Sequence, residues 1–102
     1  MSNPLQIKSP WPAYEWPQDK QSAVLLSVDV DAHVPFMWAN KDHVPDRMGT
    51  LEIRRFGPRT GIYRLLDLFA RYEAKASFYV PALTAETNPE MLAAILEGGH
   101  EI

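Results

Sequence analysis

The sequence contains no cysteine among its 102 residues. This absence excludes disulfide bridges, thiolate metal sites and a cysteine nucleophile, and it leaves the redox compartment open. The chain also lacks an excess of positive charge, because 10 Lys and Arg against 13 Asp and Glu give a formal net charge of -3. Such a balance offers little to a phosphate backbone or an anionic membrane. We therefore expect neither nucleic acid nor a membrane as a partner.

Long hydrophobic runs are missing too. No segment approaches the roughly 20 apolar residues of a membrane span, and prolines and charges interrupt the first twenty residues, where a secretory signal would be apolar. We therefore predict a cytoplasmic protein. A composition of 46% hydrophobic and 23% charged residues is typical of one globular domain, or of a piece of a larger one.

The proline distribution divides the chain into two parts. Residues 1–20 hold four of the nine prolines and two of the three tryptophans, a pattern that favours an extended arm over a helix or strand. Trp11, Tyr14 and Trp16 give this arm something to bury, against the folded part or another subunit, although a disordered arm fits as well. Residues 21–102 form the predicted domain.

Hydrophobic patterning in this domain alternates between strands and helices. A nearly continuous apolar run at 22–30 predicts a strand covered on both faces, and 75–82 predicts a second strand. An apolar stripe of Ile62, Leu65, Leu66 and Phe69 predicts a helix at about 60–72, with Thr60 as N-cap. Asn88, Pro89 and a closing Gly-Gly pair predict a helix at 87–99, after which HEI begins a third strand. This order predicts an α/β fold with a parallel sheet or a β/α barrel.

Residues 31–58 break the pattern with prolines and glycines. Only TLEIRRF, at 50–56, is compatible with a short strand. A long irregular segment just after the carboxyl end of a strand favours a functional role.

Three ionisable residues follow the first strand at every second position: Asp29, Asp31 and His33. Side chains at i and i+2 of a strand share a face, with Cα atoms about 6–7 Å apart. Two carboxylates so placed can share a divalent cation and its water, one as ligand and one as proton acceptor. Aspartate is also common where strands turn, however, and two carboxylates are fewer ligands than zinc requires.

Four blocks occur in an order that resembles the N-terminal part of the polysaccharide deacetylase superfamily: VLLSVDVDAH, RRFGPRTGIYRLLDLF, KASFYVP and NPEMLAAILEGGHEI. The resemblance spans residues 22–102 and is strongest to its cytoplasmic branch of peptidoglycan deacetylase-like and ureide- or imide-hydrolysing enzymes. It implies a distorted (β/α) barrel, incomplete in this chain. It also implies a hydrolase of amide C–N bonds that uses Zn²⁺ or another divalent metal, with Asp29 as general base and Asp31 as metal ligand.

The resemblance implies two further metal-ligating histidines, four residues apart, on a segment beyond Ile102. His100 matches a histidine that has a structural role in the family. We therefore expect residues 1–102 to be inactive alone, as a fragment or split product, and to need a complementary chain or a homo-oligomer. The substrate, a small-molecule or glycan amide, is not specified.

Other candidates remain open. Arg54, Arg55 and Arg59 match an R-x-x-G-x-R stretch of the branch, and Arg59 is a candidate to bind an anionic substrate group unless it pairs with Glu52 or Asp67 on the surface. His33 is a second candidate substrate-binding residue. His33 and His43 could instead be solvated loop residues, and Phe36, Met37 and Trp38 fit either a pocket wall or, more simply, core packing.

Two alternative functions compete with the metal-dependent amide hydrolase. One is a ureide or cyclic-imide hydrolase of allantoinase type, although such enzymes of this fold lack the Asp pair. The other is a non-catalytic fragment that serves in assembly through its Trp-rich arm and open sheet edge.

Overall fold

The computed structural model describes residues 10–42 and 47–102. These residues form an α/β structure, as the patterning predicts. Its elements are η1 (Pro17–Asp19), β1 (Ser27–Asp29), α1 (Val34–Ala39), α2 (Met48–Arg54), η3 (Gly57–Gly61), α3 (Ile62–Arg71), β2 (Ser77–Tyr79), α4 (Ala82–Thr87) and α5 (Pro89–Glu97). Within the described ranges, no helix has the length and hydropathy needed to cross a membrane.

The sheet is parallel and is built by two successive βα crossovers. β1 pairs with β2 in parallel, with Val28 opposite Phe78. On the other side of β2, Glu101 forms a parallel bridge with Ser77, and Phe78 N donates to Glu101 O at 2.8 Å. The predicted third strand is thus present as a single bridge at Glu101.

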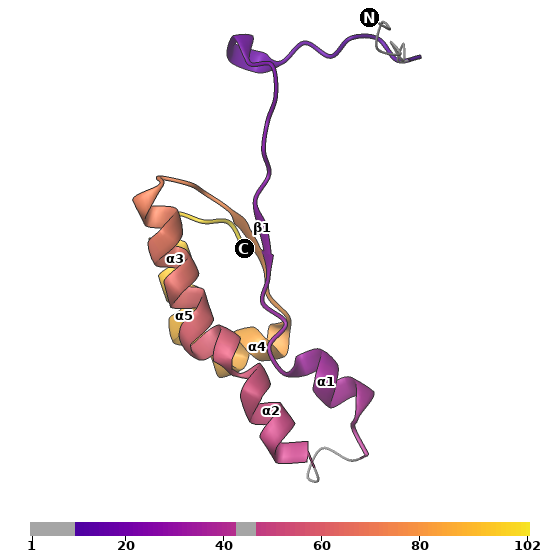
Figure 1. Cartoon of the computed structure of the whole chain (residues 1–102), viewed down its shortest axis with the longest axis vertical. Helices are drawn as coiled ribbons and strands as arrows, with labels where there is room; N and C mark the ends of the chain where they lie inside the picture. The colour runs from indigo at the N-terminus through magenta and orange to yellow at the C-terminus, as the bar shows by residue number, and fades with distance from the viewer. Residues whose placement is uncertain (1–9, 43–46) are drawn as a thin grey trace, which may run out of the picture.

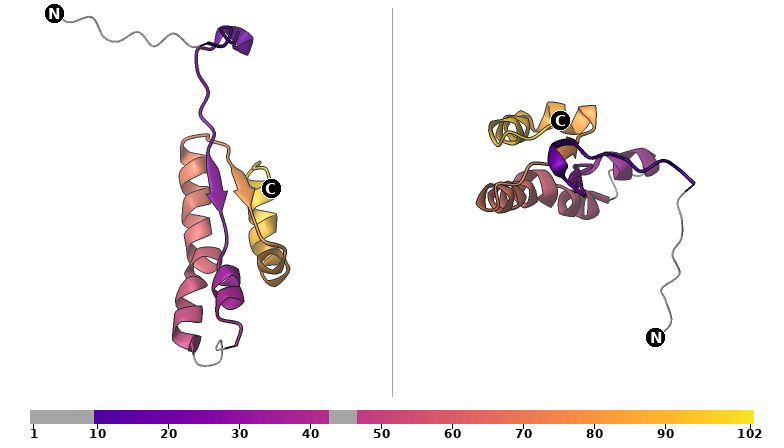
Figure 2. Two further views of the ribbon diagram at one scale, coloured as in Figure 1. Left: turned by 90° about the vertical axis from the view of Figure 1, so that its right-hand side faces the viewer. Right: turned by 90° about the horizontal axis from the view of Figure 1, so that it is seen from above.

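Helices α3 and α5 lie side by side on one face of the strands (Figures 1 and 2). The Phe69 and Phe78 rings meet edge to face across this layer, with centroids 6.3 Å apart. The buried core residues are Val30, Ile62, Ala76, Phe78, Met91 and Ile95. Because both helices cover the same face, Ser27, Asp29 and Tyr79 are left less covered on the other.

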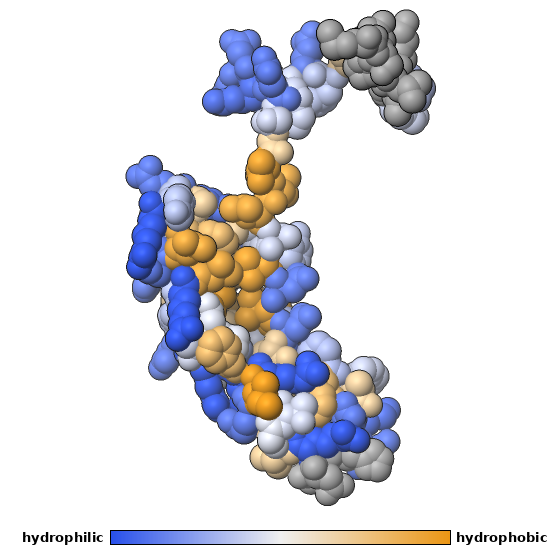
Figure 3. Space-filling model, viewed as in Figure 1, coloured by the Kyte–Doolittle hydropathy of each residue, from blue (hydrophilic) through white to orange (hydrophobic). Residues whose placement is uncertain are grey.

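The first strand is shorter than predicted, and the prediction that it is covered on both faces is wrong. Its ladder runs only from Leu26 O, which accepts from Ser77 N, to Val30 N, which donates to Tyr79 O. Val24 and Leu25 are 84% and 85% exposed because no described segment packs on them. Figure 3 shows apolar residues exposed on this segment and on the body beneath it.

The described part of the segment at 31–58 is largely helical, so its prediction as irregular with a possible short strand at 50–56 is wrong. It contains α1 and α2, and α2 buries Leu51. The chain then continues through η3, a π-helical turn in which Ile62 N donates to Gly57 O. This wider turn accommodates Pro58, which has no N–H to donate. Thr60 lies inside the turn and is not an N-cap, which corrects that prediction.

Helices α3 and α5 confirm the two predicted helices. Asn88 occupies the N-cap position of α5, but its side chain donates to Thr84 O at 2.9 Å instead of capping the helix. Gly99 follows α5 with φ 74°, and Lys75 Nζ donates to Gly98 O at 2.7 Å, which satisfies a terminal carbonyl. Helix α4 was not predicted.

The described part of the arm leads away from the folded body (Figures 1 and 2). The Tyr14 and Trp16 rings contact each other edge to face at 5.0 Å, yet both side chains and Trp11 remain exposed. Residues 10–20 therefore do not bury these aromatic rings against the body. Burial against another subunit stays a prediction.

Candidate functional site

Asp29 and Asp31 line one cavity of about 360 Å³ at the carboxyl end of β1. Asp29 is the last residue of the strand, and both residues are exposed. No other residue in the described part of the chain forms a hydrogen bond or ion pair with either side-chain carboxylate. The structure therefore places the two predicted aspartates together, and both carboxylates are available to a ligand.

The chain turns sharply just after these carboxylates. Ala32 has φ 54°, in the left-handed region that residues with a Cβ rarely adopt. Asp31 O holds the turn by accepting from Val34 N at 3.2 Å and from the Thr84 hydroxyl at 3.3 Å. Local strain of this kind persists where the surrounding structure fixes it, often at functional sites.

His33 follows this turn and lies inside the protein. His33 is only 6% exposed, so the interpretation of a solvated loop histidine is wrong. Its Nδ1 is buried and has no hydrogen-bond partner among the described residues. Burial lowers the pKa of His33, and the positive charges of Arg55 and Arg59 lower this pKa further, while Glu52 opposes them.

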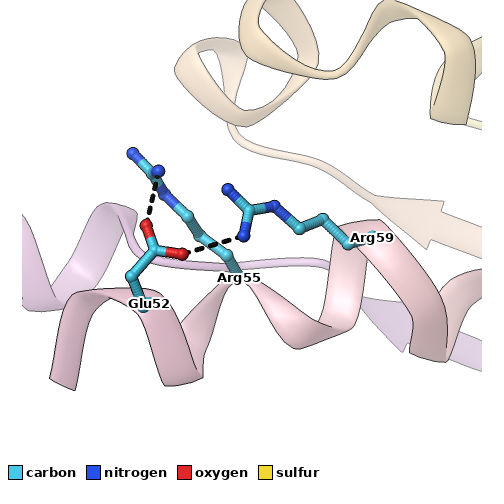
Figure 4. A network of polar contacts seen from close by, with 3 residues as sticks. All are labelled: Glu52, Arg55 and Arg59. Atoms are coloured by element: carbon cyan, nitrogen blue, oxygen red, sulfur yellow. Dashed lines mark hydrogen bonds and ion pairs between the residues drawn. The ribbon is translucent and has the colours of Figure 1, made fainter. Parts of the chain in front are cut away.

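Arg55 and Arg59 both pair with Glu52 (Figure 4). Arg55 Nη1 donates to one carboxylate oxygen of Glu52 and Arg59 Nη1 to the other, each at 2.8 Å. The hydrogen bond from Arg59 lowers the pKa of Glu52. A second cavity, of about 230 Å³, is lined by His33, Arg55, Pro58, Arg59, Thr87 and Asn88. Arg59 thus forms the alternative ion pair and also faces a cavity together with His33.

Arg54 lies in the cavity of the two aspartates, a placement that the sequence did not single out. Its guanidinium carbon lies 4.9 Å from the centroid of the Phe36 ring. The only sequence signal was its position in the R-x-x-G-x-R stretch. Trp38 is 75% exposed and contacts Lys41, so core packing is wrong for this member of the aromatic cluster.

His100 has the structural role that the resemblance implies. Its Nδ1 accepts from Ala76 N at 3.2 Å, and its ring contacts Phe69 and Phe78. Burial lowers its pKa, with a smaller contribution from Lys75, so the neutral form that accepts this bond is favoured. His43 lies outside the described residues.

The described residues contain no group of three or more His, Asp or Glu side chains that could hold a metal ion. A catalytic zinc usually has three protein ligands. Asp29 and Asp31 therefore fit only part of such a site.

Two of the comparisons with known proteins point to one family. No family model matches the chain. A peptidoglycan deacetylase of Helicobacter pylori is 31% identical over 83 residues, which are 81% of this chain and 28% of that protein. A crystal structure from Mycobacterium smegmatis, of a protein assigned as a polysaccharide deacetylase, matches with a TM-score of 0.82 and 36% identity, over 92% of this chain and 32% of that one. The chain thus spans less than a third of either relative, and over this partial length it belongs to the polysaccharide deacetylase superfamily.

Proposed function

We propose that this chain is the N-terminal part of a metal-dependent hydrolase of non-peptide amide C–N bonds. The substrate we propose is an N-acetylated glycan, since the two relatives are described as peptidoglycan and polysaccharide deacetylases. A small-molecule amide is the alternative substrate. One observation carries the proposal. Asp29 and Asp31, whose carboxylates have no partner among the described residues, lie at the carboxyl end of β1 and line a single cavity.

Asp31 would supply one ligand to the metal, which we propose to be Zn²⁺ or another divalent ion. Such an ion, when bound, polarises an amide carbonyl and acidifies a water molecule. Since the described residues hold too few ligands, the remaining ligands would come from outside residues 10–42 and 47–102. We therefore expect the 102-residue chain to be inactive alone.

Asp29 would act as the general base. Its carboxylate is exposed and has no partner in the described part of the chain, so it can accept a proton from the attacking water. Water then adds to the carbonyl carbon, the C–N bond breaks, and the products are a carboxylic acid and an amine. The acid that protonates the leaving nitrogen would come from outside the residues that the structure describes. Arg54 lines the same cavity and can donate hydrogen bonds to a substrate oxygen.

The uncovered side of the sheet supports a partner that completes a barrel. Val24 and Leu25 are exposed, and Asp29 and Tyr79 lie on the strand face that α3 and α5 leave open. We propose that a complementary segment covers this face and supplies the missing ligands. The same exposed surface favours assembly as the alternative function, in which the chain pairs with a second copy without catalysis. Localisation in the cytoplasm stays a prediction.

The test uses the complete domain, made by co-expressing residues 1–102 with the segment that supplies the remaining strands. Acetate release from an N-acetylglucosamine oligomer and metal content are measured together. We expect Asp29→Asn to lower kcat by about 100- to 10,000-fold with metal content unchanged, and Asp31→Asn to lower the metal content. Asp67→Asn is the matched control, because Asp67 pairs with Arg71 on the exposed side of α3. Full activity in Asp29→Asn would contradict the proposed base.

A further inference from the structure

Two arginine side chains converge on one carboxylate beside the second cavity (Figure 4). Arg55 and Arg59 each use one nitrogen to reach a different oxygen of Glu52. A guanidinium carries five N–H donors, and in the described part of the chain each of these two forms only this one hydrogen bond. Two positive charges against one negative charge leave the cluster with a net positive charge.

His33 and Asn88 also line this cavity. His33 is 94% buried (6% exposed) and has an Nδ1 without a partner among the described residues. Asn88 and Pro89 begin α5 beside the cavity, and the N-terminus of a helix carries a partial positive charge.

We propose that this cavity binds a small anion through a carboxylate or phosphate group held by Arg55 and Arg59. The Glu52 carboxylate already accepts a hydrogen bond from each arginine, so it competes with the ligand for these donors. The site is distinct from that of the two aspartates, because Pro58 is the one residue that lines both cavities. Binding here requires neither metal nor hydrolysis, so it can fail while the proposed function stands, and the reverse.

The experiment is a titration of the isotope-labelled chain, followed by NMR of the arginine Nε–H signals. The probes are inorganic phosphate and succinate, each at constant ionic strength and with EDTA present to exclude metal-bound anions. We expect saturable shifts at Arg55 and Arg59. Arg71, which pairs with Asp67 at 2.6 Å on the exposed side of α3, is the internal control, and its signal should not show saturable shifts. Saturation by succinate alone identifies a carboxylate ligand, and saturation by phosphate alone identifies a phosphate ligand.

Two variants with opposite expected signs test the clamp. Arg59→Gln should weaken binding about tenfold or more, since a charge-assisted hydrogen bond contributes about 1.5–3 kcal/mol. Glu52→Gln should tighten binding several-fold, because it removes the competing carboxylate while it keeps a side chain of similar size. Amide spectra confirm that each variant is folded, and Arg55→Gln replaces Arg59→Gln if that variant unfolds. The proposal is overturned if neither probe saturates, if Arg71 responds like Arg55 and Arg59, or if Glu52→Gln weakens binding.

Discussion

Polar groups at the two ends of the small sheet differ in whether they have hydrogen-bond partners. At the end where β2 begins, Ala76 N donates to His100, Lys75 donates to Gly98 O, and the Ser77 hydroxyl donates to Glu101 at 2.6 Å. At the carboxyl end of β1, the carboxylates of Asp29 and Asp31 have no partner in the described residues, and neither does Nδ1 of His33.

We propose that this difference separates residues that stabilise the fold from residues that bind a ligand. A buried polar group with a partner, such as the Ala76 N–H, supports the core, whereas a strained backbone reduces stability. Proteins break the local rules of good packing mainly at functional sites. We propose that the carboxyl end of β1, where Asp29 and Asp31 line one cavity, is the functional end of this chain.

The largest difference is expected from one substitution made at two histidines. His100→Phe leaves the Ala76 N–H without its acceptor and should lower the free energy of unfolding by about 1–3 kcal/mol. His33→Phe keeps a ring and removes an unpartnered nitrogen, so its effect should be near zero or stabilising. Urea unfolding midpoints measure both. Equal losses in the two variants would remove the distinction between the two ends.

A second pair of variants tests the tight packing around His100. A Cβ added at Gly98 would lie 2.8 Å from the His100 ring, so Gly98→Ala should lower the free energy of unfolding by about 1–3 kcal/mol. A Cβ at Gly57 meets nothing within 4 Å, and Gly57→Ala should stabilise the helix by about 0.4–1 kcal/mol. Thermal unfolding followed by circular dichroism reports both signs. A neutral Gly98→Ala would mean that the ring has room to move.

The left-handed backbone of Ala32 predicts that an alanine-to-glycine substitution there changes stability in the opposite direction from one in a helix. Ala32→Gly relieves a left-handed alanine and should be neutral or stabilising, by up to about 1 kcal/mol. Ala93→Gly, at an exposed position within α5, should destabilise by about 0.5–1 kcal/mol, as glycine usually does in a helix. The comparison uses chemical denaturation of the two variants side by side. Destabilisation by Ala32→Gly of the same size as Ala93→Gly would argue against strain at the turn.

The smallest effect is expected from pH. Burial places the folded-state pKa of His100 below 6.5, so the unfolded state binds more protons in acid. Its contribution to stability is complete above pH 6.5 and declines as the pH falls through the folded-state pKa. Unfolding midpoints at pH 8, 6.5 and 5.5 should decrease in that order, and the slope should be shallower in His100→Phe. An unchanged slope in this variant would assign the dependence to other groups, such as His33.

The sequence predicted those elements whose periodicity is long or whose ends are marked. Helices α3 and α5 carry apolar faces that repeat over several turns, and Pro89 and Gly99 mark the ends of α5. Helices α1, α2 and α4 were missed because each has only six or seven residues, too few for periodicity to show. Pro35 was read as a breaker, although it lies in the first turn of α1, where proline is tolerated.

The candidate site was predictable only where it depends on one strand. Asp29 ends β1 and Asp31 follows two residues later, so their shared cavity follows from local spacing. The places of Arg54, Arg55 and Arg59 depend on α2 continuing through a π-helical turn past Pro58. Because residues 31–58 were predicted to be irregular, with at most a short strand at 50–56, the proximity of these arginines to His33 and to the aspartates could not be inferred.

The central claim is that Asp31 binds a divalent metal beside Asp29, and titration of the labelled chain with Mn²⁺ tests it directly, since a bound paramagnetic ion broadens nearby amide signals even when binding is weak. The account predicts broadening centred on Val28–Ala32 that disappears in Asp31→Ala and persists in Asp67→Ala. Broadening that is unchanged in Asp31→Ala, or that is centred on other carboxylates, would contradict it.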